Sequence, residues 1–259
     1  MSRLLAADVR RHRSGNGPAV VVLLHCLGVD HRLWDFTAAA LERDHCVIRY
    51  DFPGHHETPV PDAPYAIEDL SAQLVDILDA ERVPSATIVG ISLGGLVAQH
   101  FAATQPERTE RVVLVDTTPR YSETMQKMWA ERAAASRAHG VASITDSLLA
   151  VWFTAEFLSA EPPAVHYVRD CFSRVSGEGY AKACEALAAA DLRMLLPDIE
   201  APTLVVCGSE DVPEFVMAAR AFARVIPDVR LAWLSPARHA SVLEQPEQFA
   251  TALGEFLRD

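Results

Sequence analysis

The chain has 259 residues, of which 50% are apolar and 22% are charged, a composition typical of a globular protein with a large core. Lysine and arginine number 23 against 35 aspartates and glutamates, which gives a formal net charge of −12. Because so acidic a chain repels polyanions, we expect neither nucleic acid nor an anionic membrane as its partner.

Short apolar runs that are rich in β-branched residues recur along the chain, and each is bounded by turn residues. They predict strands buried on both faces at residues 20–24, 46–50, 87–89, 111–115, 204–207 and 229–234. Between them, apolar residues at helical spacing predict helices at 67–78, 93–103 and 244–257. This alternation indicates an α/β fold with a mostly parallel, doubly wound sheet.

The alternation stops between Thr118 and Pro197, where the sequence keeps helical spacing but contains no convincing strand. We therefore predict a helical insertion at residues 119–197 between two parts of an α/β core, residues 1–118 and 198–259.

The five cysteines, at positions 26, 46, 171, 184 and 207, form no CxxC or Cys/His pattern. A disulfide framework and a zinc site are therefore not expected. Residues 1–8 are charged too early for a signal-peptide core, and no apolar run reaches the roughly 18 residues that span a bilayer. These features predict a cytoplasmic protein.

The motif Gly90-Ile91-Ser92-Leu93-Gly94 lies between the predicted strand 87–89 and the predicted helix 93–103. A turn this sharp holds the serine in a strained conformation, and the flanking glycines leave room for the close approach of the backbone. The serine oxygen then stands at a helix N-terminus, which favours developing negative charge. G-x-S-x-G alone is a weak signal, but its position between strand and helix predicts Ser92 as a nucleophile.

A serine nucleophile needs a base and an acid that orients the base. His239 follows the last predicted strand and precedes the last predicted helix, where the order Ser…acid…His places the base. The acid should end the preceding strand, and Asp211 is the preferred candidate there. Glu210 and Asp116 remain as alternatives.

Two backbone N–H groups are predicted to form an oxyanion hole. One belongs to Leu93, directly after the serine, and the other to Leu27, in the loop after the first strong strand. In the same loop, we expect His25 to pack beneath the chain without a chemical role and Cys26 to be buried and inert.

Together these motifs resemble the α/β-hydrolase family over essentially the whole chain, and within it the 3-oxoadipate enol-lactonase group. The stretches similar to that group are Leu27-Gly28-Val29-Asp30, Leu33-Trp34-Asp35, Arg49-Tyr50-Asp51, Pro64-Tyr65-Ala66-Ile67-Glu68-Asp69-Leu70, Gly90 to Gly95, Pro106-Glu107-Arg108, Trp152-Phe153-Thr154, Gly179-Tyr180-Ala181, Ala186-Leu187, Asp191-Leu192-Arg193, His239 and Glu244-Gln245-Pro246-Glu247. The resemblance implies that the insertion is a cap over the active site.

Three stretches depart from the pattern of that group. The chain has His25-Cys26-Leu27-Gly28 where the group usually reads Asn-Ser-Leu-Gly, and Val212-Pro213-Glu214 replaces the Thr-Pro after the acid. After Asp51 it has Phe52-Pro53-Gly54-His55-His56, which lacks the usual Arg and second Gly. Since adjacent histidines point apart on an extended chain, we assign no metal to that pair.

The resemblance implies a serine hydrolase that cleaves a small-molecule ester or lactone through an acyl-enzyme, without cofactor or metal. A carboxylated substrate would need a cation in the insertion, and the candidates are Lys127, Arg132, Arg137, Arg169, Arg174 and Arg193. We select Arg132, with Trp129 and Trp152 as candidate pocket walls.

Other activities remain open. The same three residues could hydrolyse a C–C bond or support cofactor-free peroxidase chemistry, and a non-catalytic ligand-binding protein is a further alternative. The natural substrate and the oligomeric state do not follow from the sequence.

Overall fold

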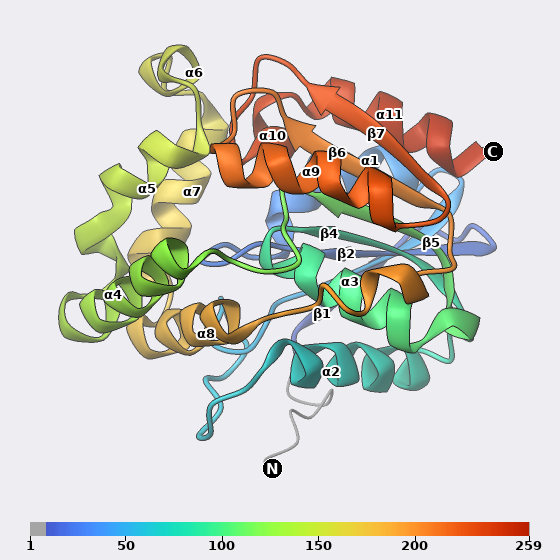
Figure 1. The fold of residues 1–259 in the computed structure, drawn as a ribbon, viewed down its shortest axis with the longest axis horizontal. Coiled ribbons are helices and arrows are strands. Elements are labelled where there is room, and N and C mark those ends of the chain that lie inside the picture. The colour runs from blue at the N-terminus through green and yellow to red at the C-terminus, as the bar shows by residue number, and fades with distance from the viewer. Residues whose placement is uncertain (1–8, 259) are drawn as a thin grey trace.

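The computed structural model describes residues 9–258, so the expectation for residues 1–8 lies outside the described part of the chain. Within it, seven strands form one sheet in the order β1-β3-β2-β4-β5-β6-β7 (Figure 1). The strands are β1 (Arg11–Ser14), β2 (Ala19–Leu24), β3 (His45–Tyr50), β4 (Ala86–Ile91), β5 (Thr109–Val115), β6 (Thr203–Gly208) and β7 (Val229–Leu234). Only β1 is antiparallel to its neighbour, β3; the other neighbouring strands pair in parallel.

The six predicted strands all lie within strands of this sheet, and the α/β fold class is confirmed. Strand β1 was not predicted. Its sequence Arg-His-Arg-Ser contains no apolar residue and so carries no strand signal. Such a sequence is tolerated because β1 is an edge strand, which has one neighbour and stays partly exposed.

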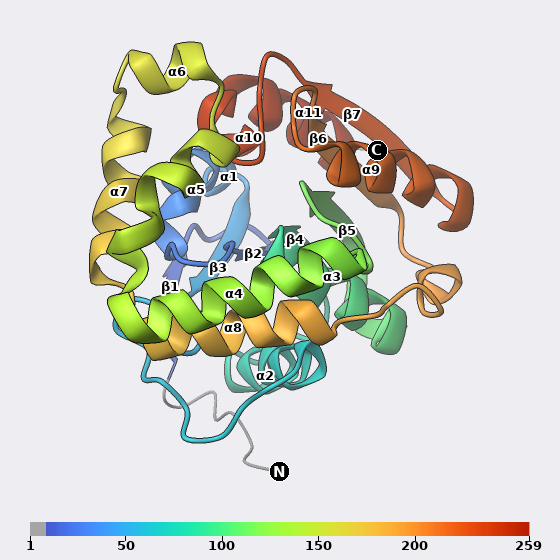
Figure 2. The same cartoon turned by 60° about the vertical axis from the view of Figure 1, so that its left-hand side comes forward.

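Helices cover both faces of the sheet. Figures 1 and 2 show α2 (Ile67–Ala80) and α3 (Leu93–Thr104) on one face, and α1 (Asp35–Leu41) and α11 (Pro246–Arg258) on the other. The predicted face of α2 is buried: Ile67, Leu70, Leu74, Ile77 and Leu78 are at most 1% exposed. Burial of each such side chain contributes about 1.5–3 kcal/mol, which fixes this helix against α3 and the sheet.

Three helices of the core differ from the expectations. The predicted helix 244–257 is two helices, α10 (Ser241–Glu244) and α11, because Pro246 fits the first turn of a helix but cannot continue one. Helices α1 and α9 (Pro213–Val225) were not predicted.

The stretch between β5 and β6 is helical, as expected for the fold. It contains α4 (Glu123–His139), α5 (Thr145–Trp152), α6 (Ala155–Ser159), α7 (Pro163–Arg174) and α8 (Gly177–Ala189), which we call the inserted helices. They lie together at one end of the sheet (Figure 2). The division into a core and a separate domain at 119–197 stays a prediction. Within residues 9–258, no helix combines the length and apolarity needed to cross a bilayer.

Candidate active site

The turn between β4 and α3 holds Ser92 in a backbone conformation that side chains rarely adopt, with φ 52° and ψ −110°. Backbone packing enforces this turn. A Cβ at Gly90 would lie 2.1 Å from the carbonyl oxygen of Gly94, and one at Gly94 would lie 2.4 Å from that of Leu24. Both glycines are therefore required by close approach, and Ser92 is placed just beyond the carboxyl end of β4.

The structure brings Ser92, His239 and Asp211 together from three separate loops. Ser92 Oγ lies 3.1 Å from His239 Nε2, and His239 Nδ1 lies 3.0 Å from Asp211 Oδ2. Because a carboxylate only accepts hydrogen bonds, Nδ1 carries the ring proton and Nε2 is free to accept one from the serine. A hydroxyl, an imidazole and a carboxylate in this chain can activate a nucleophile.

The environment of His239 favours its protonated form. The ring is buried, and burial alone lowers the pKa of His239. The charge of Asp211 and its hydrogen bond outweigh burial, so that the pKa is raised above its ordinary value. Phe215 of α9 packs against the imidazole with 4.4 Å between ring centroids, which keeps the ring in place.

Neither alternative acid contacts the imidazole. Glu210 is exposed, and its backbone N–H bonds to the carbonyl oxygen of Ala237. Asp116 is buried and accepts hydrogen bonds from the Gly208 N–H at 2.8 Å and the Ser241 hydroxyl at 2.5 Å. Gly208 precedes the loop of Asp211, and Ser241 follows the loop of His239. Asp116 therefore ties together the two loops that carry the candidate acid and base, a role that the sequence did not indicate.

Burial and the negative charge of Asp211 raise the pKa of Asp116 to about 7. Two buried carboxyl groups near one imidazole compete for the same positive charge, so one of them ionises less readily. Asp211, which bonds directly to His239, is in the better position to orient the ring.

The two candidate oxyanion donors, Leu93 and Leu27, belong to backbone segments that touch each other, at Gly94 and His25. Leu93 is the first residue of α3, so its N–H has no acceptor inside the helix. A Cβ at Gly94 would also meet the carbonyl oxygen of His25 at 2.8 Å, so the start of α3 lies against the loop that contains Leu27. This is the position at which the sequence predicts the two donors.

His25 is a structural link within that loop. It is completely buried; Nδ1 donates to the carbonyl oxygen of Cys26 at 2.7 Å, and Nε2 accepts from the Phe52 N–H at 2.9 Å. Burial lowers the pKa of His25, which keeps the ring neutral. His25 thus connects the loop after β2 to the loop after β3, and all five cysteines, Cys26 included, are free and buried.

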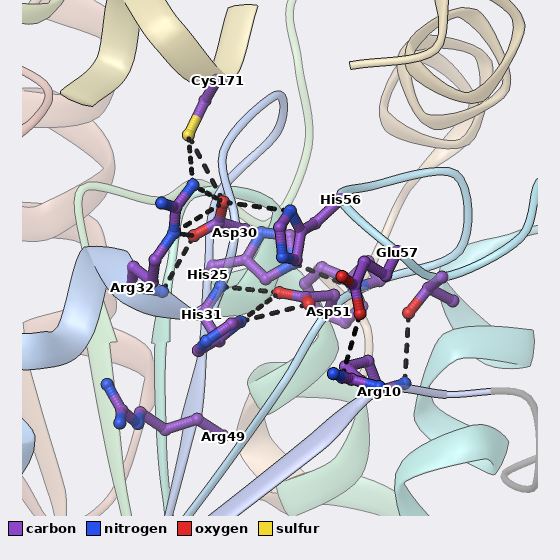
Figure 3. A network of polar contacts seen from close by, with 12 residues as sticks. Arg10, His25, Asp30, His31, Arg32, Arg49, Asp51, His56, Glu57 and Cys171 are labelled. Carbon is purple, nitrogen blue, oxygen red and sulfur yellow. Dashed lines mark hydrogen bonds and ion pairs between the residues drawn. The ribbon is translucent and has the colours of Figure 1, made fainter. Parts of the chain in front are cut away.

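The loop after β2 is also tied to the inserted helices (Figure 3). Asp30 accepts three side-chain hydrogen bonds from Arg32 and one from the hydroxyl of Tyr167 in α7, and the Cys171 thiol lies 3.5 Å from its carboxylate. Burial raises the pKa of Asp30, but hydrogen bonds and charge from Arg32 lower it more. His56, whose φ is 46°, approaches the same carboxylate at 3.8 Å.

Two further contacts join the inserted helices to the core. The buried carboxylate of Glu244 accepts hydrogen bonds from Thr154, the N-cap of α6, and from the N–H of Arg238, next to His239. A Cβ at Gly54 would lie 2.5 Å from the Cα of Gly179 in α8, so these two backbones touch. Thr154, Gly179 and Glu244 lie in stretches that resemble the enol-lactonase group, whereas Gly54 lies in a stretch that departs from it.

Among the six candidate cations, Arg132 is the one that packs on a predicted pocket-wall residue, Trp129. Its charge acts on His239 and opposes the raised pKa of that group, and its guanidinium lies 4.9 Å from the centroid of the Trp129 ring. Lys127 is exposed, and the remaining four form ion pairs with acids on exposed parts of the surface: Arg137, Arg169, Arg174 and Arg193.

The two predicted pocket-wall residues occupy different positions. Trp152 lies beside the imidazole, with 6.3 Å between ring centroids, and its carbonyl oxygen accepts from the Ala240 N–H. Trp129 packs edge-on against Tyr121, with 5.4 Å between ring centroids, and Tyr121 in turn packs against Phe215. Both tryptophans are 6% exposed, so each is mostly covered by its neighbours.

Among residues 9–258, two groups of side chains have potential metal ligands close together. In one, His12 stacks on His31 at 3.7 Å, and His31 Nδ1 bonds to Asp51 at 2.9 Å. In the other, Asp116 and Asp211 lie near Cys207. In each group a carboxylate is already hydrogen-bonded within the protein, and the absence of a metal stays a prediction.

The chain matches a known protein family. A family model described as "Alpha/beta hydrolase family" matches residues 21–252. The chain belongs to the alpha/beta hydrolase family, and the protein is therefore a hydrolase.

Among proteins of this family, the chain is 33% identical to 3-oxoadipate enol-lactonase 2 of Acinetobacter baylyi, over 96% of this chain and 94% of that protein. It is 32% identical to the pimeloyl-[acyl-carrier protein] methyl ester esterase of Chromobacterium violaceum, over 94% of this chain and 95% of that protein. The crystal structure of the enol-lactonase from Burkholderia xenovorans LB400 superposes with a TM-score of 0.93 at 34% identity, covering 97% of this chain and 96% of that one.

The link made by Asp116 can be tested with Asp116→Ala. The substitution leaves the buried donors of Gly208 and Ser241 without an acceptor, so we expect a loss of about 2–4 kcal/mol in the free energy of unfolding, measured with urea. The exposed Asp228→Ala is the matched control and should change stability by less than about 0.5 kcal/mol. Equal stability of the two variants would contradict the proposed link.

Proposed function

We propose that the protein hydrolyses a small-molecule ester or lactone, with Ser92 as nucleophile, His239 as general base and Asp211 as the acid that orients it. The observation that carries this proposal is the continuous hydrogen-bonded chain from Ser92 Oγ through the imidazole to Asp211. The similarity to the enol-lactonases supports a lactone as substrate.

The first half of the reaction forms an acyl-enzyme. Ser92 Oγ attacks the carbonyl carbon while its proton passes to His239 Nε2. The N–H groups of Leu27 and Leu93 stabilise the oxyanion of the tetrahedral intermediate. The bond to the leaving oxygen then breaks, and that oxygen takes the proton from His239; in a lactone it remains attached to the acyl group.

The second half releases the product. A water molecule gives a proton to His239 and attacks the acyl carbon, and Ser92 leaves with that proton. All proton transfers use side chains of this chain, so we propose that the reaction needs no cofactor. Trp129 and Trp152 would line the pocket that the inserted helices cover, where exclusion of water strengthens the electrostatic contacts.

We further propose that the substrate carries a carboxylate and that Arg132 binds it. Arg132 is the candidate cation whose charge reaches His239, while four of the other five are paired at the surface. The guanidinium of Arg132 lies over the Trp129 ring and contacts the hydroxyl of Tyr180, and a guanidinium can bind a carboxylate through two parallel hydrogen bonds.

Ser92→Ala tests the nucleophile. We expect kcat/KM for activated esters and enol lactones to fall by about 10³-fold or more, because the remaining groups can only orient water. His239→Ala should have a similar effect, and the double variant should be little worse than either. The exposed Ser143→Ala is the control. A fluorophosphonate that labels wild type and the control but not Ser92→Ala would support the assignment; activity of Ser92→Ala within about tenfold of wild type would refute it.

The pH dependence tests the role of Asp211. Since the base must be neutral, activity rises with pH through the pKa of His239, which Asp211 raises. In Asp211→Asn, burial still lowers the pKa of His239, but the charge of Asp211 no longer raises it. The acid limb of the pH profile of the residual kcat/KM should therefore move to lower pH. A limb that stays in place or moves to higher pH would show that Asp211 does not set the pKa of the base.

Arg132→Gln tests the carboxylate site. Loss of a charge-assisted contact should lower kcat/KM for p-nitrophenyl hemisuccinate about 10- to 100-fold, mainly through KM, and leave p-nitrophenyl butyrate within about threefold. The control is Arg137→Gln, on the same helix but paired at the surface with Glu178 and Glu185. Equal losses on both esters would exclude a specific carboxylate contact.

A panel of activated esters, enol lactones and vinylogous diketones separates the proposed activity from C–C bond hydrolysis. Measurements of peroxide-dependent turnover on the same samples address the cofactor-free peroxidase alternative. Turnover of diketones alone would replace the ester or lactone as the substrate class while keeping Ser92 and His239 as reacting groups.

A further inference from the structure

Tyr121 is a completely buried residue that lies between β5 and α4, beside the candidate active site. Its ring packs edge-on against Trp129 at 5.4 Å and against Phe215 at 6.2 Å. Phe215 in turn packs against the imidazole of His239. These contacts hold the Tyr121 ring in a fixed position one aromatic layer from the base.

The hydroxyl of Tyr121 has no hydrogen-bond partner among the described residues. Leaving a buried hydroxyl unpaired costs about 1–3 kcal/mol, so an unpaired hydroxyl beside a reacting group is a candidate for a contact with substrate. Burial raises the pKa of Tyr121, and the side chain of Ser92 opposes that rise. The hydroxyl therefore stays protonated and can act as a hydrogen-bond donor.

The order of the strands places Tyr121 opposite the oxyanion donors. Ser92 follows β4, which lies between β2 and β5. The loop of Leu27 follows β2, whereas Tyr121 comes after β5, on the side of β6 and β7, whose loops carry Asp211 and His239. In acyl transfer the imidazole side is where the leaving oxygen departs and where the attacking water enters.

We propose that Tyr121 is a further catalytic residue, whose hydroxyl donates a hydrogen bond to the leaving-group oxygen while the imidazolium of His239 protonates it. This inference rests on the proposed Ser92 chemistry. No proton is transferred from the phenol. The electron pair of the breaking C–O bond goes to the leaving oxygen, the proton comes from His239, and the Tyr121 hydrogen bond stabilises the charge that develops in between. In deacylation the same hydroxyl orients the incoming water.

Tyr121→Phe removes only the unpaired oxygen and keeps the ring against Trp129 and Phe215. The measurement is kcat/KM for acetate esters that share one acyl group but differ in leaving group: p-nitrophenyl, phenyl and trifluoroethyl. A poorer leaving group develops more charge on oxygen, so the loss should grow along the series. We expect about threefold or less for p-nitrophenyl acetate and about 10- to 100-fold for trifluoroethyl acetate, the range of a hydrogen bond to a charged oxygen.

Tyr50→Phe is the matched control. Tyr50 is also completely buried with an unpartnered hydroxyl, but it ends β3 and its ring packs edge-on against Phe52 at 5.5 Å. All three esters should react with this variant at wild-type rates. Labelling of Ser92 by a fluorophosphonate in Tyr121→Phe at about the wild-type rate shows that the variant is folded with its nucleophile intact.

The outcomes separate the two proposals. A loss that is equal for all leaving groups, or no loss, overturns the role of Tyr121 and leaves the Ser92 hydrolase intact. Failure of the fluorophosphonate to label Ser92 in the wild-type protein overturns the proposed function and this inference together. A loss that increases with the basicity of the leaving group, absent from Tyr50→Phe, supports the hydrogen bond.

Discussion

The backbone turn at Ser92 is the constraint on which the rest of the site depends. A residue with a side chain is held at φ 52°, a conformation that costs about 1–3 kcal/mol and persists only where the surroundings enforce it. The enforcing contacts are backbone to backbone: Gly90 against Gly94, and Gly94 against the end of β2. One consequence is that the hydroxyl faces the imidazole; another is that the first N–H of α3 lies beside the loop after β2.

Because the sheet is parallel from β3 to β7, the loops after β2, β4, β5, β6 and β7 all meet at one edge. The strand order alone therefore brings residues that are far apart in the chain to this edge. Asp116 adds a direct connection between two of these loops, and Glu244 connects the His239 loop to the inserted helices. Hydrogen bonds to the buried carboxylates of Asp116 and Glu244 thus connect the loops that form the site.

The parts of the fold that are buried on both faces could be predicted from the sequence, because a short, continuous, β-branched apolar run such as 20–24 is stable in water only as a covered strand. Strand β1 could not, since an edge strand of Arg, His and Ser carries no such signal. The grouping of Ser92, Asp211 and His239 followed from their order and their positions after strands. The link made by Asp116 did not, because nothing local distinguishes an acid that orients a base from one that binds neighbouring loops.

Arg132 was selected from six cations on the sequence alone, but the ion pairs of other arginines and the unpaired hydroxyl of Tyr121 become visible only when it is known what each side chain faces. Helical spacing in the insertion predicts which residues are buried, but not toward which element. The ion pairs that occupy Arg137 and Arg169 involve acids 23 to 48 positions away, which no local pattern shows.

The carboxylate of Asp30 belongs to the loop that also presents the N–H of Leu27, yet its partners Tyr167 and Cys171 belong to α7. An outward displacement of α7 must either break these contacts or carry the loop with it. The position of α7 and the position of the backbone at Leu27 are thus mechanically coupled through a single carboxylate. Any change in how the inserted helices sit on the sheet is transmitted to that loop.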